Sequence, residues 1–320
     1  MSKFEHNWQQ LADIARSETN LIPVVGSGLN IQARQQADSW TQLLHEVADN
    51  FQLSEKDLQA VDQQSYGMTA VWERFVTALA EREDRSAGQV ENLLRQTVQK
   101  SLAEDEATAS DYPFYRQFLS LDFKHIISLN FDRSLPLSVS SKKSVIEAGE
   151  TIEELNENLF RYAQVEDQET RIWYPHGDTQ KYRTIRLGVR DYGIYLDDLQ
   201  EAFNLMKMWE REDGEDFDPS TDPRVKSSWF WLGFYSPLVF LGCGMSSDLW
   251  TIWWYLHQRS RNYARVAESD TPPVFVLWNV MDDPAHLTHW LDSQPADIQL
   301  LPCLDWDEGW NRFQSVIQSS

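Results

Sequence analysis

Short apolar runs that end in glycine or polar residues constrain the fold of this chain more than any other feature. Segments with helical spacing of apolar residues separate them, so strands and helices are expected to alternate. This alternation predicts an α/β fold with a Rossmann-like, mostly parallel sheet, in which ligands bind at the carboxyl ends of the strands. The predicted strands are Leu21–Val25, Lys124–Leu129, Arg171–Asp178 (whose end carries His176 and Gly177), Leu238–Gly242 and Pro273–Trp278.

The composition limits the classes of function. The 320 residues include 50 acidic and 28 basic side chains, which give a formal charge of −22. Such a chain repels phosphate backbones, so we expect no broad nucleic-acid binding. Two cysteines cannot form a four-cysteine zinc site, and no apolar stretch approaches the roughly 20 residues of a membrane span. We therefore expect a soluble cytoplasmic protein with no metal and no membrane partner.

The domain organisation follows from the segments between the predicted strands. Residues 54–110 are polar with helical periodicity, and residues 191–230 are strongly acidic. We interpret both as helical insertions in a single domain spanning residues 1–320. Within the second, Glu210–Asp222 is typical of a solvated loop, and the following run Trp229–Trp231 is typical of a core or of an interface.

The first candidate binding residues follow the first predicted strand. Gly26, Ser27 and Gly28 allow close approach of the backbone, and a helix that begins there favours a bound pyrophosphate. Asn30 closes this turn. Short glycine turns after strands are common, so a purely structural role for the turn is equally consistent with the pattern.

The second and third strand ends carry the candidate catalytic residues. Asn130 can orient a ribose hydroxyl or a water molecule. Asp132 can hold a ribose, although capping of the next helix explains this residue better. His176 precedes Gly177 and can act as a general base near neutral pH. The pair His286 and His289 has no third ligand nearby, so we expect no metal site.

The later strand ends offer further polar groups. Gly244 and Ser246 belong to a second glycine turn that can bind phosphate or ribose oxygens. Asn279 follows the last predicted strand, where its amide can reach an adenosine ribose.

In this order, the motifs resemble those of the sirtuin family. Sirtuins carry a G-A-G-x-S turn, an N-x-D strand end, an H-G pair, a G-x-S turn and a late asparagine. The similar segments here are Gly26–Asn30, Asn130–Asp132, His176–Gly177, Gly244–Ser246 and Asn279, which span most of the chain.

The departures narrow the resemblance. Ser27 and Asn30 stand where the family usually has alanine and serine, and the four zinc-binding cysteines of protein-deacylating sirtuins are absent. The chain is more similar to the sirtuin-like domains of bacterial antiviral defence systems, which have no zinc module. That resemblance implies hydrolysis of NAD to nicotinamide and ADP-ribose, which starves an infected cell.

The resemblance also implies roles for single residues. Asn130 would position the attacking water and the ribose hydroxyls, and His176 would act as the base or orient the ribose. The residues expected to hold the dinucleotide are Gly26, Ser27, Gly28, Asn30, Asp132, Gly244, Ser246 and Asn279. The resemblance implies NAD as the substrate, and the residues agree with its cleavage, which passes through an oxocarbenium-like state.

Two other functions are open at this stage. One is a sirtuin-type protein deacylase or ADP-ribosyltransferase. The missing cysteines argue against the deacylase. The other is a catalytically silent subunit that binds NAD or ADP-ribose and regulates a partner. For an NAD glycohydrolase, control is required, and about 40 residues after Asn279 are too few for a second core. We therefore expect a separately encoded sensor or regulatory subunit, or assembly into a homo-oligomer.

Overall fold

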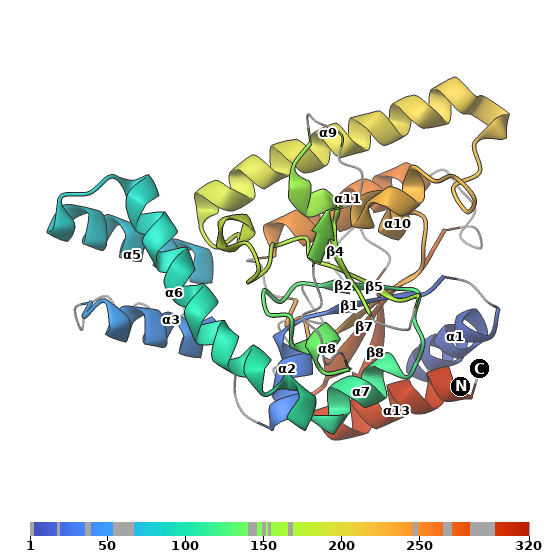
Figure 1. Cartoon of the computed structure of the whole chain (residues 1–320). Helices are drawn as coiled ribbons and strands as arrows, with labels where there is room; N and C mark the ends of the chain where they lie inside the picture. Colours follow the sequence, from blue (N-terminus) through green and yellow to red (C-terminus); the bar gives the residue numbers. More distant parts are fainter. Residues whose placement is uncertain are drawn as a thin grey trace.

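An eight-stranded sheet is the centre of the protein, shown in Figure 1 as a computed structural model. The structure describes residues 3–17, 20–35, 40–53, 67–139, 146–148, 152, 155–165, 169–245, 249–264, 271–281 and 298–319. The strands lie in the order β3-β4-β5-β2-β1-β6-β7-β8. Their bounds are β1 Ile22–Val25, β2 His125–Ser128, β3 Ile146–Ala148, β4 Arg161–Gln164, β5 Arg171–Trp173, β6 Leu238–Leu241, β7 Val274–Asn279 and β8 Ile298–Cys303.

The strands from β5 to β8 in this order are all parallel, whereas β3 and β4 add an antiparallel edge. If these six parallel strands are numbered 1 to 6 along the chain, their order across the sheet is 3-2-1-4-5-6, which is the Rossmann order. The prediction of an α/β fold with a mostly parallel, Rossmann-like sheet is therefore confirmed. The sequence analysis missed β3, β4 and β8.

Helices cover both faces of the sheet (Figure 1). Along β1, Ile22 and Val24 pack into one apolar cluster and Val25 into the other, because successive side chains of a strand point to opposite faces. The first cluster includes residues of α9 Val189–Asp213, α10 Trp229–Phe234 and α11 Trp250–Tyr263. The second includes residues of α1 Lys3–Arg16, α2 Ser27–Arg34, α7 Pro113–Leu119, α8 Ser134–Leu137 and α13 Trp306–Gln318.

Helix α9 of the acidic segment 191–230 packs into the main core. Helix α9 buries a stripe at spacings of three and four residues, and its acidic side chains occupy the opposite face. The stripe consists of Tyr195, Leu199, Ala202, Met206 and Trp209. The part expected to be a solvated loop also begins within α9 and continues as the short helix η4 Gly214–Asp216.

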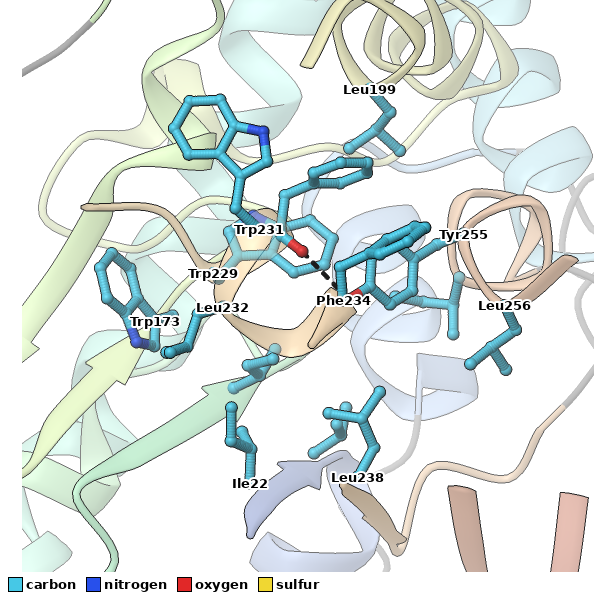
Figure 2. Close-up of a cluster of buried hydrophobic side chains, with 14 of the residues drawn as sticks. Ile22, Trp173, Leu199, Trp229, Trp231, Leu232, Phe234, Leu238, Tyr255 and Leu256 are labelled. Carbon is cyan, nitrogen blue, oxygen red and sulfur yellow. Dashed lines mark hydrogen bonds between the residues drawn. The ribbon is translucent and has the colours of Figure 1, made fainter. Parts of the chain in front are cut away.

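The aromatic run of α10 lies in the interior, so it does not form an interface. Trp229 and Trp231 are at most 1% exposed, and they pack with Phe234 and Tyr255 against the sheet (Figure 2). The Tyr255 hydroxyl donates a hydrogen bond of 3.1 Å to the backbone carbonyl of Phe230, which satisfies a polar group inside this cluster.

Three helices form a third apolar cluster beside one end of the sheet: α3 Trp40–Asn50, α5 Met68–Glu83 and α6 Ala87–Ala107 (Figure 1). We call this unit the helical arm. Helices α5 and α6 occupy the described part of the segment 54–110. The short helices are η1 Ala109–Asp111, η2 Glu157–Leu159, η3 Tyr182–Thr184 and η5 Val225–Ser227. None of the helices in the described ranges combines the length and the apolar character needed to cross a membrane.

Candidate functional site

The candidate site lies where the strand order reverses, between β1 and β6. In doubly wound sheets the connections leave such a point in opposite directions and open a crevice at the carboxyl ends of the strands. Here the turn after β1 lies directly against the turn after β6. The Gly26 amide donates to the Leu241 carbonyl at 3.1 Å and the Gly28 amide to the Gly242 carbonyl at 2.9 Å.

Close backbone packing explains the glycines of this turn. A Cβ atom at position 28 would stand 2.5 Å from the Gly242 Cα atom, and one at position 26 would stand 2.6 Å from the Gly242 carbonyl oxygen. Backbone atoms on both sides leave no room for a side chain. The predicted turn therefore forms at the predicted place, and the two glycine turns hold each other in position.

Ser27 is the residue of the turn that is best placed to bind an anion. Helix α2 begins at Ser27, and the amides of Gly26, Gly28 and Leu29 already donate to backbone carbonyls. Within the described residues, neither the amide nor the hydroxyl of Ser27 has a protein acceptor or donor, and the residue is half-buried. The helix N-terminus adds a partial positive charge at this point.

Asn130 reaches the same turn from the end of β2. Its Nδ2 donates to the Gly26 carbonyl at 3.0 Å, which fixes the orientation of the carboxamide. No donor among the described residues reaches its Oδ1, and the residue is half-buried. The arrangement leaves an oriented acceptor beside the start of α2.

Asn30 and Asp132 also come together, but they form a buried polar network. Asn30 Nδ2 donates to Asp132 Oδ2 at 2.7 Å, and the Tyr115 hydroxyl donates to Asn30 Oδ1 at 3.0 Å. The Asp132 Oδ1 atom accepts from the Ser134 amide at 3.0 Å at the start of α8, although the N-cap residue of that helix is Arg133. The side-chain polar atoms of Asn30 and Asp132 are thus bonded to other protein groups.

His176 is buried more deeply than a strand-end base facing a ligand would be. Its Nε2 lies 3.4 Å from Thr251 Oγ1 of α11, and its ring meets the ring of Tyr192 of α9 edge-on at 5.4 Å. The residue is 2% exposed. The imidazole is therefore part of the packed interior, because Thr251 of α11 and Tyr192 of α9 both contact it.

Burial also sets the protonation of His176. Desolvation lowers its pKa, hydrogen bonding to the backbone of Leu129 raises it and the charge of Arg186 lowers it, which together leave the pKa at about 4. The imidazole is thus neutral at physiological pH and can accept a hydrogen bond or a proton. Leu129 precedes Asn130, so the two candidate catalytic side chains are joined through one backbone segment.

The structure describes two of the three remaining binding residues. Gly244 lies two residues after Gly242 and is exposed, whereas Ser246 lies outside the described residues. Asn279 ends β7, which β6 separates from β1, and its Oδ1 accepts from the Met281 amide at 3.0 Å. His286 and His289 also lie outside the described residues. Among the described residues, no group of three or more His, Cys, Asp or Glu side chains can hold a metal ion.

Sequence reasoning missed Tyr192, Thr251 and Arg186, which surround His176. Tyr192 and Thr251 are on helices, whereas the sequence analysis searched the strand ends. Each stands in the first turn of its helix at a buried position, and its contact with His176 depends on how α9 and α11 pack against the sheet. Cys243, at the end of β6, is a poor nucleophile because burial raises the pKa of its thiol to about 12.

Comparison with known proteins adds no further constraint to this geometry. No model of a protein family matches the chain, and no curated protein matches it. The resemblance to sirtuins accordingly depends on the order of the motifs, and the function has to be argued from the site.

Proposed function

We propose that the protein is an NAD glycohydrolase that cleaves NAD to nicotinamide and ADP-ribose. The observation that carries the proposal is the hydrogen bond of 3.0 Å from Asn130 to Gly26. It joins an oriented carboxamide to the start of α2 at the reversal of the strand order, where a dinucleotide is expected to bind. The neutral imidazole of His176 lies on the next strand end.

Each group has a defined task in this reaction. Ser27 and the N-terminus of α2 bind the pyrophosphate. The Asn130 Oδ1 atom orients the attacking water and a ribose hydroxyl as positive charge develops on the ribose. His176 accepts a hydrogen bond from the ribose or the water. His176 Nε2 lies 3.4 Å from Thr251 Oγ1, which is long for a hydrogen bond, so a hydroxyl of the ribose or the water can replace this contact.

We further propose that the protein acts in antiviral defence by depleting NAD, under the control of a partner subunit or of self-assembly. This part rests on the resemblance to sirtuin-like defence domains and on the need to restrain an enzyme that consumes NAD. A catalytically silent subunit that binds NAD or ADP-ribose is the second candidate. The burial of His176 favours it, because a base with 2% exposure has little access to a substrate.

The proposal predicts release of nicotinamide from NAD by the purified chain, alone or with the product of a neighbouring gene. Asn130→Ala should lower turnover by roughly 10²–10³-fold, which is typical of losing one well-placed polar group in a transition state. Asn311→Ala, at an exposed position of α13, is the matched control and should leave turnover unchanged.

Two results would contradict the proposal in different ways. Binding of NAD or ADP-ribose in calorimetry without nicotinamide release under any condition would establish the silent subunit. Absence of both binding and release would exclude NAD as the ligand of this site.

A further inference from the structure

We propose that Glu106 of α6 is a positioning residue that holds Asn130 and His176 at a fixed separation. As a statement about catalysis, the inference rests on the proposed NAD hydrolysis. As a statement about structure, it rests on one carboxylate that binds both strand-end segments.

The first contact of Glu106 is with the segment after β2. Its Oε1 accepts from the Arg133 amide at 2.9 Å, and its Oε2 accepts from Arg133 Nη2 at 2.9 Å. The two side chains are 7% and 17% exposed, so solvent screens this ion pair only weakly. Arg133 lies three residues after Asn130, and the carboxylate therefore fixes the backbone that carries the carboxamide.

The second contact is with the segment after β5. The Thr179 hydroxyl donates to the same Oε1 atom of Glu106. Thr179 lies three residues after His176, which matches the spacing of the first contact. The Thr179 amide also donates to the Phe131 carbonyl at 3.0 Å, so the two segments touch each other where the carboxylate binds both.

Other residues of α6 support the same segments. Gln99 donates a hydrogen bond to the Thr179 carbonyl. Arg95 forms a buried ion pair with Asp191 at 2.6 Å, next to the Tyr192 ring that packs on His176. Phe131, next to Asn130, belongs to the apolar cluster of the helical arm. Helix α6 thus contacts the segments after β2 and β5 and the start of α9.

A carboxylate fits this position best because it accepts on both oxygens. In Glu106→Gln, Oε1 can still accept from the Arg133 amide and from Thr179, but the amide nitrogen faces the Arg133 guanidinium, and both groups are donors. In Glu106→Leu every contact is lost. The pair of variants gives a graded removal of the link with little change in side-chain size.

The structural test is hydrogen–deuterium exchange of peptides that contain residues 130–133 and 176–180. Glu106→Leu should speed exchange in both peptides by about tenfold, and Glu106→Gln should have a smaller effect. Thr179→Val should have a smaller effect in Glu106→Leu than in the wild type, because the Thr179–Glu106 hydrogen bond is already lost and only the 3.3 Å bond from Arg133 Nε to the Thr179 hydroxyl is left to remove. The control is Glu81→Gln, an exposed glutamate of α5 in the same helical arm.

The catalytic test separates positioning from general stability. In Glu106→Leu, kcat for nicotinamide release should fall by roughly 10- to 100-fold with little change in KM, whereas Glu106→Gln should keep most of kcat. Unchanged exchange in either peptide, or unchanged kcat in the leucine variant, would overturn the inference. Failure of the wild-type protein to release nicotinamide would overturn the proposed function instead, and the exchange data alone would then decide the positioning role.

Discussion

The imidazole of His176 packs between Tyr192 and Thr251, and the lowered pKa follows from this enclosure. Neither the strand-end position nor the following glycine, both visible in the sequence, determines such a pKa. The segment is stabilised by a further buried pair, because Asp178 binds the Arg161 guanidinium at 2.6 Å. Burial raises the pKa of that carboxyl, and the arginine opposes the rise.

Acid should destabilise the fold through His176. Its pKa is about 4 in the folded chain and 6.5 when unperturbed, so the unfolded chain binds a proton first as the pH falls. The stability is complete above pH 6.5 and is lost between pH 6.5 and 4, by up to about 3 kcal/mol. Urea unfolding at several pH values should show a weaker decline for His176→Gln, and the exposed control His6→Gln should follow the wild type. A decline in His176→Gln equal to that of the wild type would contradict the buried, neutral state.

Among the elements, the glycine turns after β1 and β6 show the tightest constraint. Gly28→Ala should destabilise the fold by about 1–3 kcal/mol, because the new methyl group meets the backbone of Gly242 and neither chain can yield without moving a strand. The matched control is Gly193→Ala, since a Cβ atom there meets nothing within 4 Å inside helix α9. That control should stabilise the fold by about 1 kcal/mol. Chemical unfolding measures both, and an equal response of the two variants would contradict the close packing of the turns.

The sequence predicted the elements whose pattern is strong within a short window. Strands β1 and β6 are continuous apolar runs, β7 is apolar up to its last residue, and β2 and β5 each carry a buried apolar pair, as expected of strands buried on both faces. Strand β4 was not predicted because its residues are mostly polar. Strand β8 was not predicted because it is partly exposed and contains Pro302. Helix α9 packs into the core through a buried stripe that its many charged residues make hard to recognise in the sequence.

At the scale of the whole molecule, contacts between distant segments could not be predicted from the sequence. The Asn30–Asp132 hydrogen bond joins residues 102 positions apart, and the bond from Asn130 to Gly26 spans 104. The sequence placed both asparagines at strand ends, but only the packing of strands and helices decides which carboxamide stays accessible and which is enclosed. The position of α6 against both strand ends depends in the same way on the complete fold (Figure 1).

The net charge of the whole molecule, −22, favours a basic partner. We expect such a partner to bind the outer face of α9. Ile194 and Met208 are exposed there by 48% and 40% among charged and polar residues, an arrangement typical of interfaces. The aromatic run Trp229–Trp231 lies in the core and takes no part. Glu210 and Asp213 bind neighbouring side chains, so they are poor choices for a test of this surface.

Replacing Glu212, Glu215 and Asp216 by serine should weaken assembly, because these exposed carboxylates lie at the end of that surface. The effect should be large at low salt and fade as salt rises, since ions screen exposed charges, and NAD binding should not change. The control replaces the exposed carboxylates Glu46, Asp49 and Glu81 of the helical arm by serine, which changes the net charge equally. Light scattering, with and without the neighbouring gene product, compares the masses. Equal masses for the wild type and both variants in every mixture would show that this surface carries no assembly.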